Sequence, residues 1–595
     1  MKGKRTDFDF GSMLMKNKNL IIVLISFIVF LLFFIFLQRT CEYHFYYIEQ
    51  DQMFRFSANY FQDKIVRPGG FALVIAQFLL QFFSIKYLGA TILSILLTFI
   101  VFVVGGIMKR FESRKEFLIL SLIPSVLLMY AQFQFNYQLQ GTIAFLLAVV
   151  ALYTYLMLKN YSIRLITGLV LTVLLFIFAG SVFVLFAVSA LLFELLRRNK
   201  KWYLSGTFLI VATVVIVFSI RTGMLGEFKF AALPDMYYNN LLKSPPYSIF
   251  AWLSMPLCSI VAFVSPYLNN KDSRVKSQVF FSIGFVLIGV FIFTAFEKEN
   301  NPESTKYKKL DYYSYTSQWD KIIEINKERT NNYLHLNILN RALSEKGELA
   351  DRMFAFNQNG VYSLMVEGNV PALLTDIYFT MGDIATSQRY AFEAYISSQG
   401  NENPRMLQRL VQTNLIFGAF PVAEKYISLL EQTLFYKKWA SAQRKFLYND
   451  ATVESDPLLG NKRKGLHPEG EEYNIFGIER DLEDIAAANP SDKKAIEYLG
   501  AIYLLNKDIV KLHDLFDKYY NGKVLQKMPR SFQEAVMIMS VNFPDVLDKY
   551  AVSPEVQNGF YGFNKDVTDN QQNYYLKDLI FNKYGNTYWY YYMFK

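Results

Sequence analysis

The side chains best suited to chemistry lie in one polar stretch, Cys41 to Gly70, which reads CEYHFYYIEQDQMFRFSANYFQDKIVRPGG. It follows the first long apolar run, and Glu49 and Asp51 are its candidate acids. A carboxylate in such a loop can act as a general base on an acceptor hydroxyl group. The acids are two residues apart, so a helix would point them in different directions. We place Glu49 slightly ahead of Asp51 as the base. The alternative is that both are solvated loop carboxylates.

Three arginines are candidate ligands for a phosphate group, because a guanidinium can bind phosphate through two parallel hydrogen bonds. Arg67 lies near the end of the same stretch, and Arg221 opens a second polar segment that extends to Tyr247. Arg55 is a weaker candidate. A site of this kind would place a base beside cations that hold a departing phosphate.

Composition indicates two unlike parts. The chain has 595 residues, of which 53% are hydrophobic and 17% aromatic, and its mean hydropathy is +0.17. It is too apolar for one soluble domain and too polar for a protein that lies wholly in a membrane. The net charge of +10 fits the Lys and Arg excess of cytoplasmic loops, so we expect no nucleic acid partner. Two cysteines, Cys41 and Cys258, favour neither a zinc site nor a disulfide framework.

The first part, residues 20–296, reads as an all-α polytopic membrane bundle with about nine spans. Residues 1–19 are polar and basic, so we expect them in the cytoplasm. The apolar runs are each about long enough to cross ~30 Å of hydrocarbon. They lie near 20–37, 91–108, 116–133, 141–158, 163–179, 181–196, 203–220, 248–267 and 276–296.

Charge in the connectors decides the status of a further run at 69–86. The basic connectors between the later runs lie together on the cytoplasmic side of the membrane only if the chain crosses the membrane once, not twice, between Arg67 and Lys109. We therefore predict an outer loop at 38–90 that contains an interfacial amphipathic helix at 69–86.

Ionisable residues within the apolar runs are scarce. Glu194 is the only acid inside such a run rather than at its first residue, and we expect it to pair with Arg197 at the membrane interface. No histidine is expected in a span. An ion-coupled transporter and an acyltransferase with an intramembrane histidine are therefore disfavoured.

The second part, after a charged linker at 297–311, is predicted to be an extracytoplasmic helical repeat domain at 312–570. Gly347, Gly382 and Gly418 recur about every 35 residues. The segment NPSDKKAIEYLGAIYLLNKDIVKLHDLFDKYY resembles the tetratricopeptide (TPR) pattern, with Gly500 at the small first-helix position.

Two segments interrupt or follow these repeats. Residues 449–474 read as an inserted loop, in which the run from Lys462 to Lys464 is expected to be solvated. Residues 571–595 form an aromatic tail, and we expect it to dock on its own domain rather than on the membrane or a partner.

The first 160 residues resemble the GT-C class of membrane glycosyltransferases in pattern. In that class an acid follows the first span, and a basic residue and prolines then open a helix on the outer interface. Glu49 or Asp51 takes the place of the acid, and Arg67-Pro68 matches the basic step. The resemblance implies a polyprenyl-phosphate-linked sugar as the donor and an outer-face lipid, glycan or protein as the acceptor.

One segment departs from this family. Members commonly carry another acid in a later outer loop, where it helps some of them to bind a metal. Here that loop reads FNYQLQG, with Asn136, Gln138 and Gln140 as polar residues of the cavity. No metal site is predicted, a divalent metal is not supported by the sequence, and no other cofactor is expected.

Two functions of different class follow. The protein is a lipid-linked-sugar glycosyltransferase whose repeats recruit the acceptor, or it is a non-enzymatic scaffold whose TPR-like repeats bind another envelope protein. In both cases we expect a multi-pass protein of the bacterial inner membrane, in contact with the lipid bilayer, with a cytoplasmic N-terminus and a periplasmic C-terminal domain.

Overall fold

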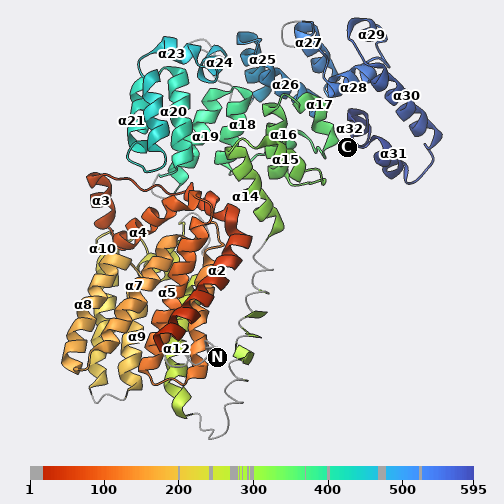
Figure 1. Ribbon diagram of the computed structural model, residues 1–595. Helices are drawn as coiled ribbons and strands as arrows, with labels where there is room; N and C mark the ends of the chain where they lie inside the picture. Colours follow the sequence, from red (N-terminus) through yellow and green to blue (C-terminus); the bar gives the residue numbers. More distant parts are fainter. Residues whose placement is uncertain are drawn as a thin grey trace, which may run out of the picture. The chain divides into compact units, whose positions relative to one another are not determined.

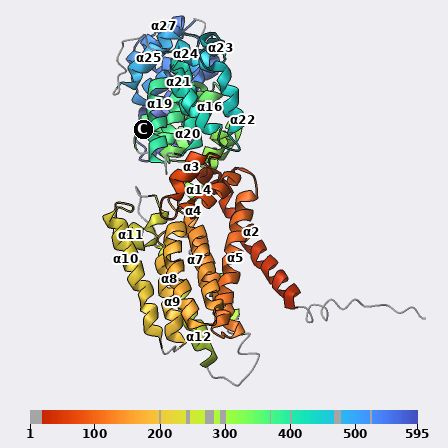
Figure 2. The ribbon, with the colours of Figure 1, turned by 90° about the vertical axis from the view of Figure 1, so that its left-hand side faces the viewer.

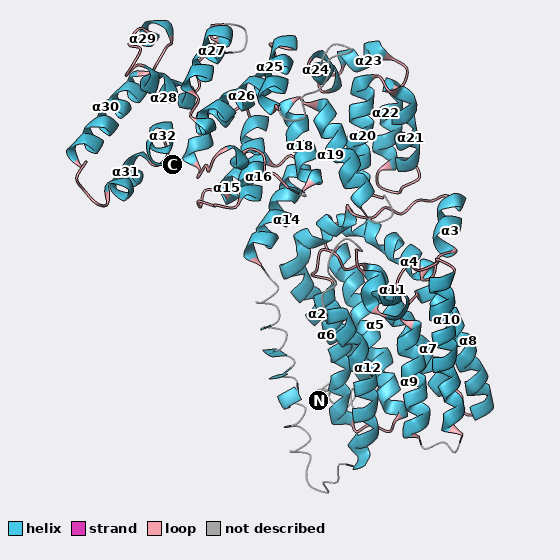
Figure 3. Cartoon of the chain, turned by 180° about the vertical axis from the view of Figure 1, so that it is seen from behind, coloured by secondary structure: helices cyan, strands magenta, loops and turns pink. Residues whose placement is uncertain are grey.

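The computed structural model describes residues 18–197, 201–239, 246–267, 301–368, 370–398, 402–466, 477–521 and 525–595, and isolated positions between 279 and 294. In these residues every regular element is a helix, and the only β pairing consists of two isolated bridges (Figure 3). The all-α prediction is therefore confirmed for this part of the chain. The chain divides into two compact units, Met1–Asn301 and Pro302–Lys595 (Figure 1).

The first unit is a bundle of mostly long apolar helices. Its shorter elements include the 3₁₀ segments η1 (Gln81–Ser84), η2 (Lys115–Ser121) and η4 (Pro234–Tyr237). Its α-helices are α2 (Lys18–Glu49), α3 (Ala58–Ile65), α4 (Gly70–Leu80), α5 (Leu88–Arg110), α6 (Leu122–Ala131), α7 (Leu139–Met157), α8 (Tyr161–Ala179), α9 (Phe183–Leu196), α10 (Thr207–Arg221), α11 (Phe228–Ala232) and α12 (Tyr247–Val264).

Six helices among the described residues are long and apolar enough to cross a membrane, fewer than the nine spans predicted. They are α2, α5, α7, α8, α10 with the turn before it, and α12. The run predicted at 116–133 forms η2 followed by α6 of only ten residues. The run at 181–196 forms α9 of 14 residues, about 21 Å at 1.5 Å per residue. The run at 276–296 lies mostly outside the described residues.

The predicted outer loop begins later than expected. Helix α2 does not end at Leu37 but continues to Glu49, because no Gly or Pro interrupts residues 38–49. The loop after it, residues 50–87, folds back onto the bundle, and α4 packs on α7 and α8 (Figure 2). We call residues 50–87 loop 1.

A buried ion pair joins three helices at the end of the bundle opposite loop 1. Glu194 in α9 does not pair with Arg197, as predicted, but with Arg164 in α8, through two hydrogen bonds of 2.7 and 3.0 Å. The hydroxyl of Tyr155 in α7 donates to the same carboxylate at 3.0 Å. Both charged side chains are buried, so removing one partner would leave a costly unpaired charge. The pair links α7, α8 and α9.

The second unit consists of short helices in antiparallel pairs. The linker predicted at 297–311 is helical from Pro302 onward. The helices are α14 (Pro302–Tyr315), α15 (Trp319–Ile325), α16 (Tyr333–Glu345), α17 (Leu349–Arg352), α18 (Pro371–Met381), α19 (Ile384–Ser397), α20 (Pro404–Phe417), α21 (Phe420–Leu430), α22 (Lys437–Gln443), α23 (Asp450–Ser455), α24 (Leu459–Lys464), α25 (Ile478–Ala488), α26 (Lys493–Asn506), α27 (Ile509–Tyr519), α28 (Arg530–Met539), α29 (Val546–Lys549), α30 (Pro554–Asp569), α31 (Leu576–Tyr584) and α32 (Tyr588–Phe594).

The repeat glycines lie in the turns between paired helices. Gly347, Gly382 and Gly418 follow α16, α18 and α20, each with a positive φ of 70 to 104°, which glycine adopts without steric cost. Lys507 takes the same kind of position after α26. The helix–turn–helix units exist as expected, whereas their assignment to the TPR family stays a prediction.

One carboxylate ties three of these helices together. Asp376 in α18 accepts hydrogen bonds from Arg341 in α16 at 3.1 Å and from Arg405 and Arg409 in α20 at 2.6 and 2.8 Å. Burial alone would raise the pKa of Asp376, but the charges of the three arginines outweigh it and hold that pKa well below its usual range. Arg405 also binds Asp311 in α14 at 2.9 Å.

The predicted inserted loop contains helices α23 and α24. In its basic run Lys464 is exposed as expected, whereas Lys462 and Arg463 are not fully solvated. Lys462 is 5% exposed and donates to the carbonyl of Thr380 at the end of α18. Arg463 donates to the carbonyls of Leu415 and Ile416 near the end of α20. Cations stabilise helix C-termini because the unpaired carbonyls there carry partial negative charge. The two residues therefore cap neighbouring helices.

The aromatic tail docks on its own unit. Residues Tyr588 to Tyr591 are buried. The indole of Trp589 donates to the backbone carbonyl of Glu534 at 2.9 Å, and the hydroxyl of Tyr591 donates to the carbonyl of Leu505 at 2.9 Å. The tail thereby covers α28 and the end of α26.

Gly500 tests the packing of the second unit. A Cβ atom at this position in α26 would lie 2.3 Å from Cζ of Phe532, whose side chain is fully buried. We expect Gly500→Ala to destabilise the protein by about 1–3 kcal/mol, measured as a lower unfolding temperature of the full-length protein in detergent. Lys493→Ala, at an exposed position of α26, is the control. Equal unfolding temperatures for the two variants would contradict this packing.

Candidate functional site

The predicted site residues all belong to one end of the first unit. Loop 1 leaves the C-terminal end of α2 and returns to the start of α5. It docks where α7 begins and α8 ends, because the amide of Gln140 donates to the carbonyl of Gly69 at 3.0 Å. Helix α8 ends beside loop 1, α9 returns to the opposite end of the bundle, and α10 then comes back. Arg221 at the end of α10 therefore belongs to the same end as loop 1 (Figure 2).

The two acids differ in their surroundings. Glu49 is the last residue of α2 and is 3% exposed. Asp51 lies in the turn that follows and is partly exposed. Burial raises the pKa of Asp51 to about 6, since a low-dielectric environment disfavours the charged form. Asp51 thus combines a pKa of about 6 with partial exposure.

Gly69 fixes the position of the Arg67-Pro68 segment in loop 1. Its φ is +74°, and its N–H donates to the carbonyl of Ile177 in α8 at 2.9 Å. A Cβ atom here would lie 3.0 to 3.2 Å from Met236, Gln140 and Ala179. Only glycine fits without displacement. Arg67, two residues before Gly69, is exposed.

Two cations of loop 1 contact the same tyrosine ring. The guanidinium carbon of Arg55 lies 5.3 Å from the ring centre of Tyr60, and the ammonium of Lys64 lies 5.7 Å from the same ring. Tyr60 is buried, and its hydroxyl donates to the amide oxygen of Gln77 in α4. Arg55 is therefore held by the interior of loop 1 through cation–π contact. The sequence did not single out Lys64, because its charge gives no sign of its burial.

Arg67 and Arg221 are exposed, and neither side chain contacts an acid within the described part of the chain. No described contact joins either arginine to Asp51. The structure therefore brings these groups to one end of the bundle and leaves the two guanidinium groups accessible to an anion.

The segment that contains the three predicted amides packs this end through its backbone and through the side chain of Gln140. The carbonyl of Asn136 accepts from the N–H of Asn239 at 2.9 Å, and the N–H of Gln138 donates to the carbonyl of Tyr237 at 3.0 Å. Gln140 holds Gly69. The side chains of all three are at least nine-tenths buried. These hydrogen bonds connect the start of α7 to loop 1 and to residues 237–239.

A polar network at this end was missed by the sequence reasoning. His44 lies within α2, contrary to the expectation that no histidine is in a spanning helix. Its Nε2 lies 2.5 Å from the carbonyl oxygen of Gln132, whose amide donates to Thr142 at 2.9 Å. The uninterrupted helical pattern beyond Leu37 was the available signal. Among the described residues, no cluster of His, Cys, Asp and Glu could hold a metal ion.

Comparison with known proteins identifies a family. A family model described as a family of unknown function, DUF6057, matches residues 16–595. No curated protein and no solved structure matches the chain.

The docking of loop 1 can be tested at Gly69. We expect Gly69→Ala to release the loop, because the added methyl group meets three neighbours and the positive φ becomes strained. Trypsin should then cleave after Lys64, which is 8% exposed, several-fold faster than in the wild type. Val66→Ala, at a position that is 73% exposed, is the control. Equal cleavage rates for both variants would contradict the docking.

Proposed function

The chain belongs to the DUF6057 family, and we propose that this member is a GT-C-like glycosyltransferase that moves a sugar from a polyprenyl-phosphate donor to an outer-face acceptor. The observation that carries the proposal is the docking of Gly69 on α7 and α8. It holds Asp51 and Arg67 of loop 1 at the end of the apolar bundle where α2 ends with Glu49 and α10 ends with Arg221.

The reaction follows from the groups at that end. Asp51 accepts the proton of an acceptor hydroxyl as the oxygen attacks the anomeric carbon of the sugar. The bond from that carbon to the phosphate oxygen breaks, and Arg67 and Arg221 bind the departing lipid phosphate. Asp51 is better suited to this role than Glu49, because it is partly exposed and its pKa is about 6.

A scaffold function is the second candidate, and the amides at the start of α7 favour it. The side-chain amide of Gln140 holds Gly69, and the backbones of Asn136 and Gln138 pair with Asn239 and Tyr237, so this segment serves packing. On this alternative the spans anchor the second unit, whose TPR-like helix pairs bind another envelope protein.

The acids separate the two functions. In cells that lack the gene, we expect the Glu49→Ala, Asp51→Ala double variant to leave the envelope glycan defect uncorrected, whereas Asp63→Ala, an exposed acid of α3, corrects it as the wild type does. Transfer by wild-type membranes should rise as the pH increases through about 6, because the base must be ionised. Full correction by the double variant would favour the scaffold.

The proposed orientation is that of a multi-pass protein of the bacterial inner membrane. On this proposal about nine spans place residues 1–19 in the cytoplasm and the second unit in the periplasm, and α4 with η1 lies along the outer interface.

A reporter fused near Glu112 tests this orientation. We expect it to be active only as a cytoplasmic reporter, because loop 1 returns without crossing and α5 then crosses once. The same reporter after residue 595 should read periplasmic. A periplasmic reading near Glu112 would contradict the proposed side of every later loop.

A further inference from the structure

An apolar groove on the first unit has cationic residues at one end only. It lies between α2, α5 and the segment formed by η2 and α6, with Gly289 also in its lining, and its volume is about 680 Å³. This volume is in the range of pockets that hold one small molecule. We call it the α2–α5 groove. Its polar lining residues are Lys109, Lys115 and Ser121.

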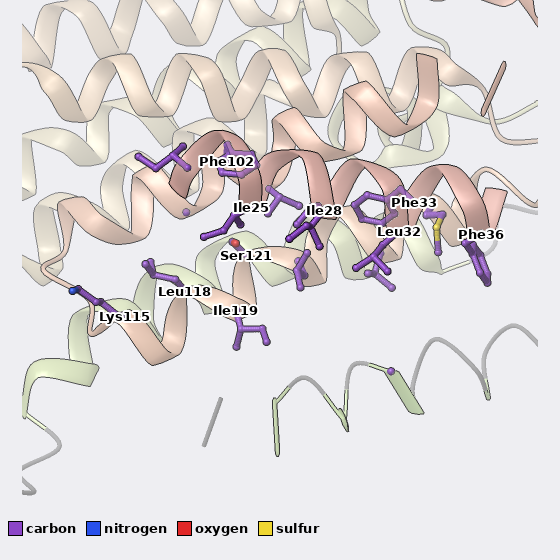
Figure 4. A pocket seen from close by; sticks show the side chains of 18 of the residues that line it. Ile25, Ile28, Leu32, Phe33, Phe36, Phe102, Lys115, Leu118, Ile119 and Ser121 are labelled. Carbon is purple, nitrogen blue, oxygen red and sulfur yellow. The ribbon is translucent and has the colours of Figure 1, made fainter. Parts of the chain in front are cut away.

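The apolar wall of the groove comes mainly from α2. Ile25, Ile28 and Leu32 point into it, with Phe36 toward one end and Lys115 at the other (Figure 4). Ile25, Ile28 and Leu32 are each about half exposed. From Ile22 to Phe36 the wall extends about 21 Å at 1.5 Å per residue. The hydrocarbon of one membrane leaflet is about 15 Å thick, so the groove is long enough for the acyl chains of a lipid.

The charge at the lysine end is unbalanced. From Lys109 to Glu116 the chain has four basic and two acidic residues, a net charge of +2. Arg114 pairs with Glu116 at 3.5 Å. Lys109 and Lys115 are exposed, and neither makes an ion pair in the part of the chain that the structure describes. Two free ammonium groups at the mouth of an apolar groove complement a phosphate with hydrocarbon chains.

We propose that the α2–α5 groove binds one anionic phospholipid of the bilayer, with the phosphate between Lys109 and Lys115 and the acyl chains against α2, α5 and α6. This site lies at the opposite end of the bundle from loop 1. It is independent of the proposed glycosyl transfer, since none of its residues takes part in that reaction.

The headgroup is tested by charge removal. Full-length protein in detergent is mixed with equal amounts of phosphatidylglycerol and phosphatidylcholine, and bound lipid is counted by native mass spectrometry. We expect the wild type to retain one phosphatidylglycerol molecule in preference to phosphatidylcholine. Lys109→Gln with Lys115→Gln should lower that preference roughly tenfold or more, because each lysine contributes separately to the binding free energy of an anionic headgroup. Lys159→Gln with Arg197→Gln, two exposed cations at the same end, is the matched control.

The chain-binding part of the groove is tested by filling it. Gly105 in α5 lines the groove, and a Cβ atom there meets only Ser121, at 3.7 Å. Gly105→Leu should therefore fold and should lower the retention of both lipids. Gly206→Leu, where a Cβ atom meets nothing within 4 Å, is the control. Equal retention in both glycine variants, or an unchanged preference after removal of both lysines, would overturn the proposal.

Discussion

The backbone of Gly69 is the contact on which the proposed site depends. Its N–H and carbonyl are both engaged, by Ile177 in α8 and by Gln140 in α7. Because the left-handed backbone leaves no room for a side chain, the loop docks in this way only with glycine at position 69. Asp51 and Arg67 then belong to the same end of the bundle as Arg221, although the chain separates them by more than 150 residues.

Buried charges organise both units, and each does so by joining elements distant in sequence. Arg164 and Glu194 link three helices of the first unit. In the second unit Asp376 gathers arginines from α16 and α20. Such pairs contribute specificity of packing more than net stability, because the desolvation cost offsets much of the attraction. A change at either acid would leave buried cations unpaired.

The sequence predicted the elements better than their contacts. Apolar runs located most long helices, and Gly382 and Gly418 marked the turns, because both signals are local. The nearest cation in sequence to Glu194 is Arg197, but packing of α9 on α8 selects Arg164. Lys462 looked like part of a solvated run, yet it caps a helix 82 residues away. The order of the helices predicts that Arg67 and Arg221 lie at the same end of the bundle, because α9 and α10 run in opposite directions. The sequence could not predict that both side chains are accessible, because this depends on three-dimensional packing.

Photo-crosslinking tests the central claim most directly. Membranes containing the full-length protein are treated with a photoreactive prenyl phosphate, and the modified peptides are identified by mass spectrometry. If loop 1 is the site of glycosyl transfer, crosslinks should fall within residues 49–67 and beside Arg221, and excess unlabelled prenyl phosphate should suppress them. Arg67→Gln with Arg221→Gln should weaken them several-fold, because both guanidinium groups would bind the phosphate. Crosslinks that avoid loop 1, or that resist competition, would contradict the account.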